Sequence, residues 1–248
     1  MEKLKTIRNI FSIHPLTYLF IILGFMFGFF KKVIFYMVII IFHELGHLFI
    51  ALLFHWNVSK IYIYPLGGIT KFNDVVNKPF YQELLINIFG PLIQIVVAFY
   101  LSKYDSSVNN FSNALLFFNL LPIIPLDGGR LVFILINRVF PLKKCIKYII
   151  VLSFYIYFLF LYYFIFKYNS LFFLITLFFL IFKIIDEKKE LKYYFDKFLL
   201  ERYMYSFKFK KSIVIDDIYK MYKYKNNIIL KDNIIYDEKE ILNFYFKR

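Results

Sequence analysis

Long runs of apolar side chains constrain the fold of this chain more than any other feature. Runs of about 15–25 residues, long enough for a helix to cross a bilayer, occur at 16–30, 33–54, 82–101, 111–136, 148–166 and 171–185. Hydrophobic residues make up 60% of the 248 residues, against about 45–50% in a typical soluble domain. The sequence therefore predicts an all-α polytopic membrane protein with about six transmembrane helices.

Basic residues between the spans predict their orientation. If both termini are cytosolic, ten Lys and Arg residues of the connecting segments face the inner side and four face the outer side. The inner group is Lys3, Lys5, Arg8, Lys60, Lys71, Lys78, Arg138, Lys143, Lys144 and Lys147, and the outer group is Lys31, Lys32, Lys103 and Lys167. Because positively charged loops favour the cytosolic side, we expect an integral, multi-pass membrane protein with both termini cytosolic.

The loop at residues 55–81 breaks the helical pattern. Its segment KIYIYPLGGITKF, residues 60–72, alternates Ile with Tyr and continues with Pro-Leu-Gly-Gly. Alternation with a period of two, followed by turn residues, is typical of a β-hairpin. We therefore expect a re-entrant hairpin loop between the second and third spans.

The chain changes character near residue 186. The last 63 residues are charged and amphipathic, with 15 basic and 11 acidic side chains, so they carry only 4 of the 14 net positive charges. This balance argues against a nucleic-acid-binding tail and against nucleic acid as a partner. We predict two domains, a membrane domain at residues 1–185 and a small cytosolic module at residues 186–248.

Three polar residues interrupt the second apolar run, VIIIFHELGHLFIALLF at residues 38–54. Polar side chains at bilayer depth are costly, so they usually face a partner, a cavity or a metal. In a helix, His43 and His47 project from one face about one turn apart. Two histidines at this spacing with Glu44 between them form the HExxH pattern of zinc hydrolases. The alternative is a pair of histidines whose hydrogen bonds tie neighbouring spans together.

A catalytic zinc ion needs a third protein ligand and an open position for water. Asp127 is the best candidate for that ligand, because it is the other acidic residue well inside a predicted span. It lies in NLLPIIPLDGGR, residues 119–130, where two prolines break the helix and two glycines permit a sharp turn. Irregular backbone of this kind is tolerated at membrane depth where it lines a watery cavity, which a hydrolytic site requires.

Together these motifs resemble a known family. HELGH in the second span, LGG in the loop after it, NIFGP in the third span and NLLPIIPLDGGR in the fourth are similar to motifs of the site-2 protease family of intramembrane zinc metalloproteases. IHPL near the N-terminus, the six-span layout and the length resemble its sporulation members most. The resemblance covers roughly residues 10–200, and it implies that residues 1–185 form an intramembrane metalloprotease domain.

The resemblance implies a role for each site residue. One Zn²⁺ per chain would be held by His43, His47 and Asp127, with Glu44 as the general base. The residues expected to position the substrate are Asn119, Gly67 and Gly68. For Asn119 the alternative is a hydrogen bond that ties spans together.

Several residues stay without an assigned role. Gln94 stands where many family members carry asparagine, and no function is inferred for it. His14 is either a ligand or a contact at the edge of a span, and Arg130 either pairs with the negative groups of the site or reaches the inner surface. The sporulation members carry a cytosolic domain of the cystathionine-β-synthase (CBS) type. The 63 residues here allow at most one reduced CBS-like repeat, and nucleotide sensing stays open.

The resemblance also implies a function and partners. The substrate would be a membrane-tethered protein cut near the cytosolic face, namely the precursor of a sporulation sigma factor, whose pro-sequence is removed. The hairpin would clamp an extended substrate as an added strand. The alternatives are a protease with another membrane substrate, such as an anti-sigma factor, and a non-proteolytic metal-binding membrane protein. The other expected partners are the lipid bilayer, inhibitory or regulatory membrane proteins, and further copies of the chain in an oligomer.

Overall fold

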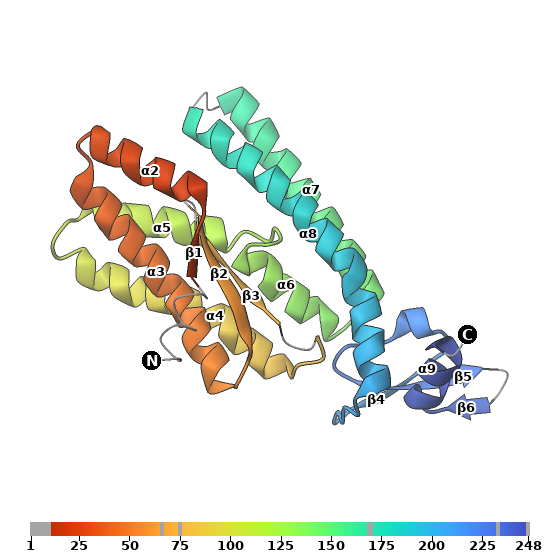
Figure 1. Cartoon of the computed structure of the whole chain (residues 1–248). Coiled ribbons are helices and arrows are strands. Elements are labelled where there is room, and N and C mark those ends of the chain that lie inside the picture. Colours follow the sequence, from red (N-terminus) through yellow and green to blue (C-terminus); the bar gives the residue numbers. More distant parts are fainter. Residues whose placement is uncertain (1–10, 65–66, 74–75, 168–170, 232–233, 247–248) are drawn as a thin grey trace. The chain divides into compact units, whose positions relative to one another are not determined.

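The computed structural model of the chain describes residues 11–64, 67–73, 76–167, 171–231 and 234–246 (Figure 1). Its helices are α2 (Pro15–Met26), α3 (Phe30–Leu53), α4 (Phe80–Leu101), α5 (Ser107–Asn119), α6 (Asp127–Asn137), α7 (Leu142–Lys167), α8 (Leu171–Met204) and α9 (Glu238–Phe246), with a 3₁₀ turn at Ile218–Lys220. Its strands are β1 (Phe11–Ile13), β2 (Val58–Tyr64), β3 (Gly67–Phe72), β4 (Ser212–Ile215), β5 (Asn226–Lys231) and β6 (Ile234–Tyr236). The chain is therefore mostly helical.

Two small sheets correct the expectation of an all-α fold. In the first sheet the strand order is β1-β2-β3, with β1 parallel to β2 and β3 antiparallel to it. The alternating segment forms the predicted hairpin, since β2 and β3 pair antiparallel from Val58–Phe72 to Tyr64–Gly67. The second sheet, in the order β4-β5-β6, belongs to the C-terminal residues. Strands of three or four residues, such as β1 and β4, are too short to leave a periodic pattern in the sequence.

Three helices are long and apolar enough to cross a membrane among the residues that the structure describes. They are α3, α4 and the segment Leu142–Tyr163 of α7. Helix α2 is also apolar but has only 12 residues. Most of the residues of α4 and of this part of α7 are not buried in the protein, and many of their exposed side chains are apolar, which suits contact with lipid.

The predicted fourth span, residues 111–136, is two helices and not one. Helix α5 ends at Asn119 and α6 begins at Asp127, and Pro122 and Pro125 lie between them. A proline has no backbone N–H to donate and its ring clashes with the preceding turn, so the helix cannot run through this segment. The interruption that the sequence indicates is therefore complete, and it places Asp127 at the start of a helix.

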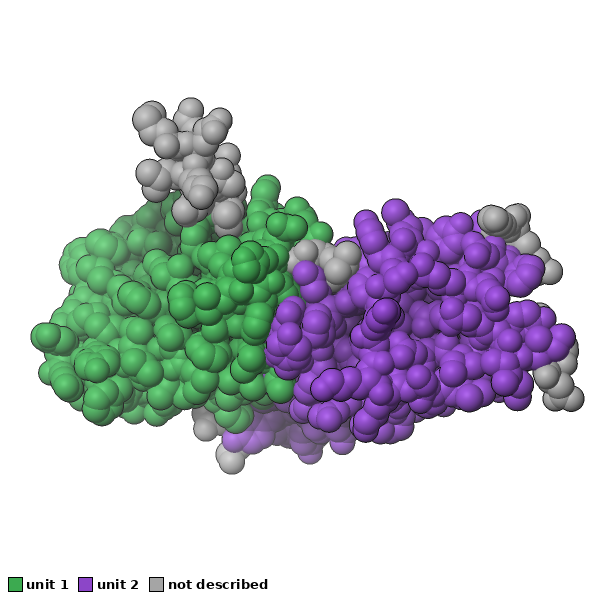
Figure 2. All heavy atoms as spheres, turned by 90° about the horizontal axis from the view of Figure 1, so that it is seen from below, with its two compact units in different colours: residues 1–74, 84–121 green, residues 75–83, 122–248 purple. Residues whose placement is uncertain are grey.

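The contacts of the chain divide it into two compact units (Figure 2). The first unit consists of residues 1–74 and 84–121, and the second of residues 75–83 and 122–248. Helix α4 thus begins in the second unit and continues through the first. The predicted domain boundary between residues 185 and 186 lies within the continuous helix α8, and that division stays a prediction.

The C-terminal residues of the second unit pack around the end of α8. Phe198 and Leu199 of α8 are fully buried against Met221, Ile229 of β5 and Leu242 of α9. Burying side chains of this size stabilises a fold by about 1.5–3 kcal/mol each. The C-terminal residues therefore share an apolar core with the end of α8.

In the first unit, α3 and α4 approach each other closely at Gly46. A Cβ atom built at Gly46 would lie 2.7 Å from the carbonyl oxygen of Phe89 and 3.0 Å from the Cα of Gly90. Both neighbours are backbone atoms, which cannot rotate away as a side chain can. The absence of a side chain at Gly46 therefore sets the distance between these two helices.

Substituting Gly46→Ala should separate α3 from α4. Overpacking of a tight contact costs about 1–3 kcal/mol, so the midpoint of thermal unfolding in detergent should fall by several degrees. Leu52→Ala, on an exposed face of the same helix, is the control and should leave the midpoint nearly unchanged. An unchanged midpoint for Gly46→Ala would contradict the close contact.

Candidate metal centre

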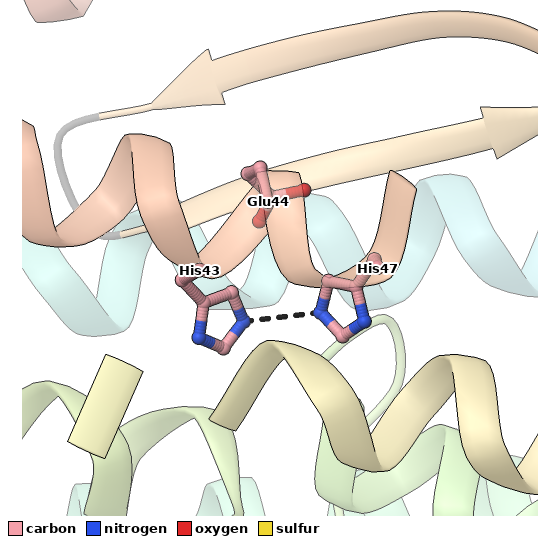
Figure 3. Close-up of side chains that lie close together, drawn as sticks. All are labelled: His43, Glu44 and His47. Atoms are coloured by element: carbon pink, nitrogen blue, oxygen red, sulfur yellow. Dashed lines mark hydrogen bonds between the residues drawn. The ribbon is translucent and has the colours of Figure 1, made fainter. Parts of the chain in front are cut away.

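Helix α3 brings His43, Glu44 and His47 together in the interior of the first unit (Figure 3). All three side chains are buried, with 2%, 2% and 5% of their surface exposed. One potential ligand atom from each lies within 4.8 Å of the other two. The four-residue spacing therefore places both imidazoles on one side of the helix, as the sequence predicts.

Each histidine is oriented by a hydrogen bond from its Nδ1 atom to α4. His47 Nδ1 lies 2.7 Å from the carbonyl oxygen of Ile86, and His43 Nδ1 lies 2.8 Å from Oε1 of Gln94. A carbonyl oxygen can only accept a hydrogen bond, so Nδ1 of His47 carries the proton. In the neutral ring, Nε2 of His47 then presents a lone pair.

Gln94 fixes the tautomer of His43 in the same way. Its amide nitrogen donates to the carbonyl oxygen of Ser112 over 2.9 Å and lies 3.2 Å from the Ser112 hydroxyl. Because a carbonyl oxygen cannot donate, the nitrogen must face Ser112 and Oε1 must face His43. His43 therefore also donates from Nδ1 and presents a lone pair at Nε2.

The two Nε2 atoms face each other. They are 3.1 Å apart, the approach drawn as a dashed line in Figure 3. Two lone pairs at this distance repel, so a proton or a cation between them is required. The pair is thus arranged as two ligands directed at one point.

Sequence reasoning missed the role of Gln94. The side chain is fully buried in α4 and links α3 to α5 through His43 and Ser112. A buried amide in an apolar helix needs hydrogen-bond partners on neighbouring elements. The signal in the sequence was therefore the polar side chain itself, within an apolar span. Which partners it has depends on how α3, α4 and α5 pack, which a single sequence does not contain.

The hairpin lies against Glu44. The hydroxyl of Thr70 in β3 donates to Oε2 of Glu44 over 2.8 Å. A Cβ atom at Gly68 would overlap the carboxylate of Glu44, so the strand can pass this close only with glycine there. Thr70 is a second contact that sequence reasoning did not assign. The structure thus brings one of the two hairpin glycines beside the predicted base.

The other predicted hairpin glycine lies beside Asn119. Gly67 has a φ of +130°, which L side chains rarely adopt, and a Cβ atom there would lie 3.3 Å from Oδ1 of Asn119. Asn119 is buried at the end of α5. The amide of Asn119 and the backbone of the hairpin are therefore neighbours, although the role of each in positioning a substrate stays a prediction.

The remaining predicted residues belong to other elements. Asp127 is the first residue of α6 in the second unit, and its role as a ligand stays a prediction. Arg130 lies in the same helix, and its role also stays open. His14 is the N-cap of α2, where its Nδ1 accepts from the backbone N–H of Leu16 at 3.3 Å, and its ring lies tilted against that of Tyr64. These contacts fit the capping and edge role of His14.

Known proteins resemble this chain in sequence. The chain is 32% identical to stage IV sporulation protein FB of Bacillus subtilis over 142 residues, which are 53% of this chain and 49% of that protein. It is 28% identical to a zinc metalloprotease of Methanocaldococcus jannaschii over 121 residues, which are 44% of this chain and 35% of that protein. The matched part therefore spans half or less of the length of these relatives.

The fold also has a solved relative. The structure of the site-2 protease from Methanocaldococcus jannaschii matches with a TM-score of 0.59 and covers 72% of this chain and 90% of that one, at 21% identity. At this identity the likeness concerns the fold. In sequence, the model of peptidase family M50 matches residues 32–104 and 107–162, which include the HExxH helix, the hairpin and Asp127. The chain therefore belongs to peptidase family M50.

Proposed function

We propose that this chain is an intramembrane zinc endopeptidase that cuts a membrane-tethered protein near the cytosolic face. The observation that carries the proposal is the convergence of two Nε2 lone pairs, with a buried carboxylate on the same turn of α3. Membership in peptidase family M50 supports a proteolytic use of this arrangement. The similarity to proteins named as zinc metalloproteases supports zinc as the metal, one ion per chain.

The donor set fits zinc. Two nitrogens bound to one tetrahedral Zn²⁺ lie about 3.3 Å apart, and the Nε2 atoms of His43 and His47 are 3.1 Å apart. Histidines that bind a metal usually donate their other ring N–H to a carbonyl or amide oxygen, as Ile86 and Gln94 accept here. Asp127 would complete the protein ligands.

The reaction assigns distinct tasks to the residues of the chain. When bound, zinc would polarise the scissile carbonyl and lower the pKa of water toward about 7. Glu44 would take the proton of the attacking water and pass it to the leaving amine. Thr70 holds one oxygen of Glu44 by its hydrogen bond, so the carboxylate keeps a fixed direction while the other oxygen accepts the proton.

The edge of the first sheet is suited to hold the substrate. A helical substrate hides its carbonyl groups in internal hydrogen bonds, so the scissile segment must be extended. Strand β3 is the last strand of its sheet, and an extended segment can add to such an edge. Because Thr70 and Gly68 of β3 lie against Glu44, a strand added there would run close to the base. Asn119 would then be near enough to polarise or orient the peptide.

The membrane placement belongs to the same proposal. We place six spans in the bilayer, with the hairpin re-entrant, both termini and residues 186–248 in the cytosol, and the centre nearer the inner leaflet. The excess of basic residues on the inner side supports this orientation. The similarity to stage IV sporulation protein FB supports the precursor of a sporulation sigma factor as the substrate, and residues 1–185 as the protease domain.

Replacing Glu44 by Gln should abolish cleavage. The amide cannot take up a proton, and loss of a general base lowers rates by about 10²–10⁴-fold. The chain would be co-expressed in a heterologous bacterium with the pro-sigma factor of its own organism, and shortening of the precursor followed on gels. Asp186→Asn makes the same carboxylate-to-amide change on the exposed surface of α8 and should process normally.

The outcomes separate the parts of the proposal. If the wild type and Asp186→Asn shorten the precursor and Glu44→Gln does not, both the protease activity and the substrate are supported. Equal processing by Glu44→Gln would show that the chemistry assigned to α3 is wrong. If neither the wild type nor Glu44→Gln cleaves the precursor, the assigned substrate is wrong. Co-expression of these two chains with an anti-sigma factor then tests the alternative substrate.

Replacing Gln94 by Leu should weaken zinc binding. His43 would lose the acceptor that fixes its tautomer, and losing such a partner typically lowers metal affinity by about 10–100-fold. The affinity is measured on the purified chain in detergent by competition with a chelating dye. Asn109→Leu, an exposed amide of α5, is the control and should bind zinc as the wild type does. Equal affinity for Gln94→Leu would contradict the orienting role.

A further inference from the structure

The segment that leads into α4 is held by residues far along the chain. Both oxygens of the buried Glu201 carboxylate, in α8, accept from the backbone N–H of Val76, at 2.7 and 2.8 Å. One of them also accepts from the backbone and side-chain amides of Asn77, at 3.1 and 2.9 Å. Glu201 therefore satisfies the backbone of a stretch that has no regular secondary structure.

The neighbouring residue Arg202 extends this link to α9 and to the loop before β5. Its Nε donates to Oδ1 of Asn77 over 2.7 Å, and its two terminal nitrogens donate to the Glu238 carboxylate at 2.9 Å and to the carbonyl oxygen of Lys223 at 2.6 Å. Burial lowers the pKa of Arg202, and the nearby Glu238 carboxylate opposes that effect. Arg202 thus joins the segment before α4, α9 and the loop before β5 into one network.

The loop before β5 also binds the first turn of α4 directly. Lys223 Nζ lies 2.6 Å from Oε1 of Glu83, and the hydroxyl of Tyr224 donates to the other oxygen, Oε2, over 2.6 Å. Only 1% of the Lys223 surface is exposed, and its Nζ also lies 3.0 Å from the hydroxyl of Tyr194. Burial lowers the pKa of Lys223, but the carboxylate of Glu83 beside it outweighs this effect, so the pKa lies well above its usual value. Lys223 and Glu83 therefore form a buried ion pair.

Glu83 is close in sequence to the residue that orients His47. Three residues later in α4, about 4.5 Å along the helix axis, the carbonyl oxygen of Ile86 accepts the Nδ1 proton of His47. Pro91 lies within α4 and lacks the N–H that would bond to the carbonyl of Asn87. Because that helix bond is missing, the first two turns are coupled less firmly to the rest of α4. Their position then depends more on what holds residue 83.

We propose that Lys223 and Tyr224 are positioning residues of the metal centre. By holding Glu83, they fix the first turn of α4 and thereby the carbonyl oxygen that orients His47. The C-terminal module is on this view a structural part of the catalytic machinery. The inference deepens the proposed function and rests on it, because it assumes that His43 and His47 bind the metal.

Lys223→Met tests this inference with Zn²⁺ itself as the probe. The full chain is purified in detergent, the folded fraction is collected by size exclusion, and its Zn²⁺ affinity is measured by competition with a chelating dye. We expect affinity to fall about tenfold, the low end of the effect of losing a partner of a metal ligand. Lys220→Met breaks an ion pair of the same 2.6 Å length with Asp216, exposed on the same module, and should leave zinc affinity unchanged.

Two further variants test the same inference with smaller changes to the buried pair. Tyr224→Phe removes only the hydroxyl that holds Oε2 of Glu83, so it should fold and bind zinc more weakly by a smaller factor. Combining Glu83→Gln with Lys223→Met removes both buried charges, while Tyr224 can still donate to the amide oxygen. The double variant should recover much of the affinity that Lys223→Met alone loses, because no unpaired charge remains.

The results separate three conclusions. If folded Lys223→Met and Tyr224→Phe bind zinc as tightly as the wild type and Lys220→Met, the inference is overturned. If Lys223→Met does not fold, Tyr224→Phe decides alone by the same measurement. If the wild type binds zinc but cleaves no substrate, the proposed protease activity is overturned. The zinc affinities of the variants then still decide this inference.

Discussion

Each histidine of α3 uses one ring nitrogen for a hydrogen bond to α4, and that bond determines where the other nitrogen points. The rest of the site depends on this arrangement. A ring without a partner could rotate, whereas here Gln94 and the carbonyl of Ile86 hold both rings so that their Nε2 atoms converge. The close approach of the two helices at Gly46 brings these acceptors within reach. The orientation of the two histidines therefore depends on how α3 packs on α4.

Much of the centre follows from local sequence, because the chemistry of an HExxH helix is local. Four-residue spacing places His43 and His47 on one face whatever surrounds them. The hairpin is similarly local, since alternation followed by Pro, Leu and two glycines in the sequence predicts it. The partners of these groups are not local. Gln94 and Thr70 could be recognised only once the register between helices and strands was known.

The fold, like the metal centre, has some features that the local sequence predicts and others that depend on distant residues. Two prolines are enough to predict that the segment before Asp127 is not helical, but they do not show that the interruption is complete. The strand β1 has three residues, and its parallel pairing with β2 joins positions 50 residues apart, such as Phe11 and Ile61. Likewise, no feature near Glu83 indicates that Lys223 is its partner, 140 residues away. Buried charge pairs of this kind are evident from sequence only as charged residues without an assigned partner.

Helix α8 has a mechanical consequence. It runs for 34 residues without a break, about 51 Å, whereas the hydrocarbon core of a bilayer is about 30 Å thick. The C-terminal residues thus pack around the end of one long, continuous helix. Tilting a rigid rod of this length by one degree moves its far end by about 0.9 Å. Because Glu201 and Arg202, near the end of α8, hold Asn77, such a movement would carry the segment before α4 with it.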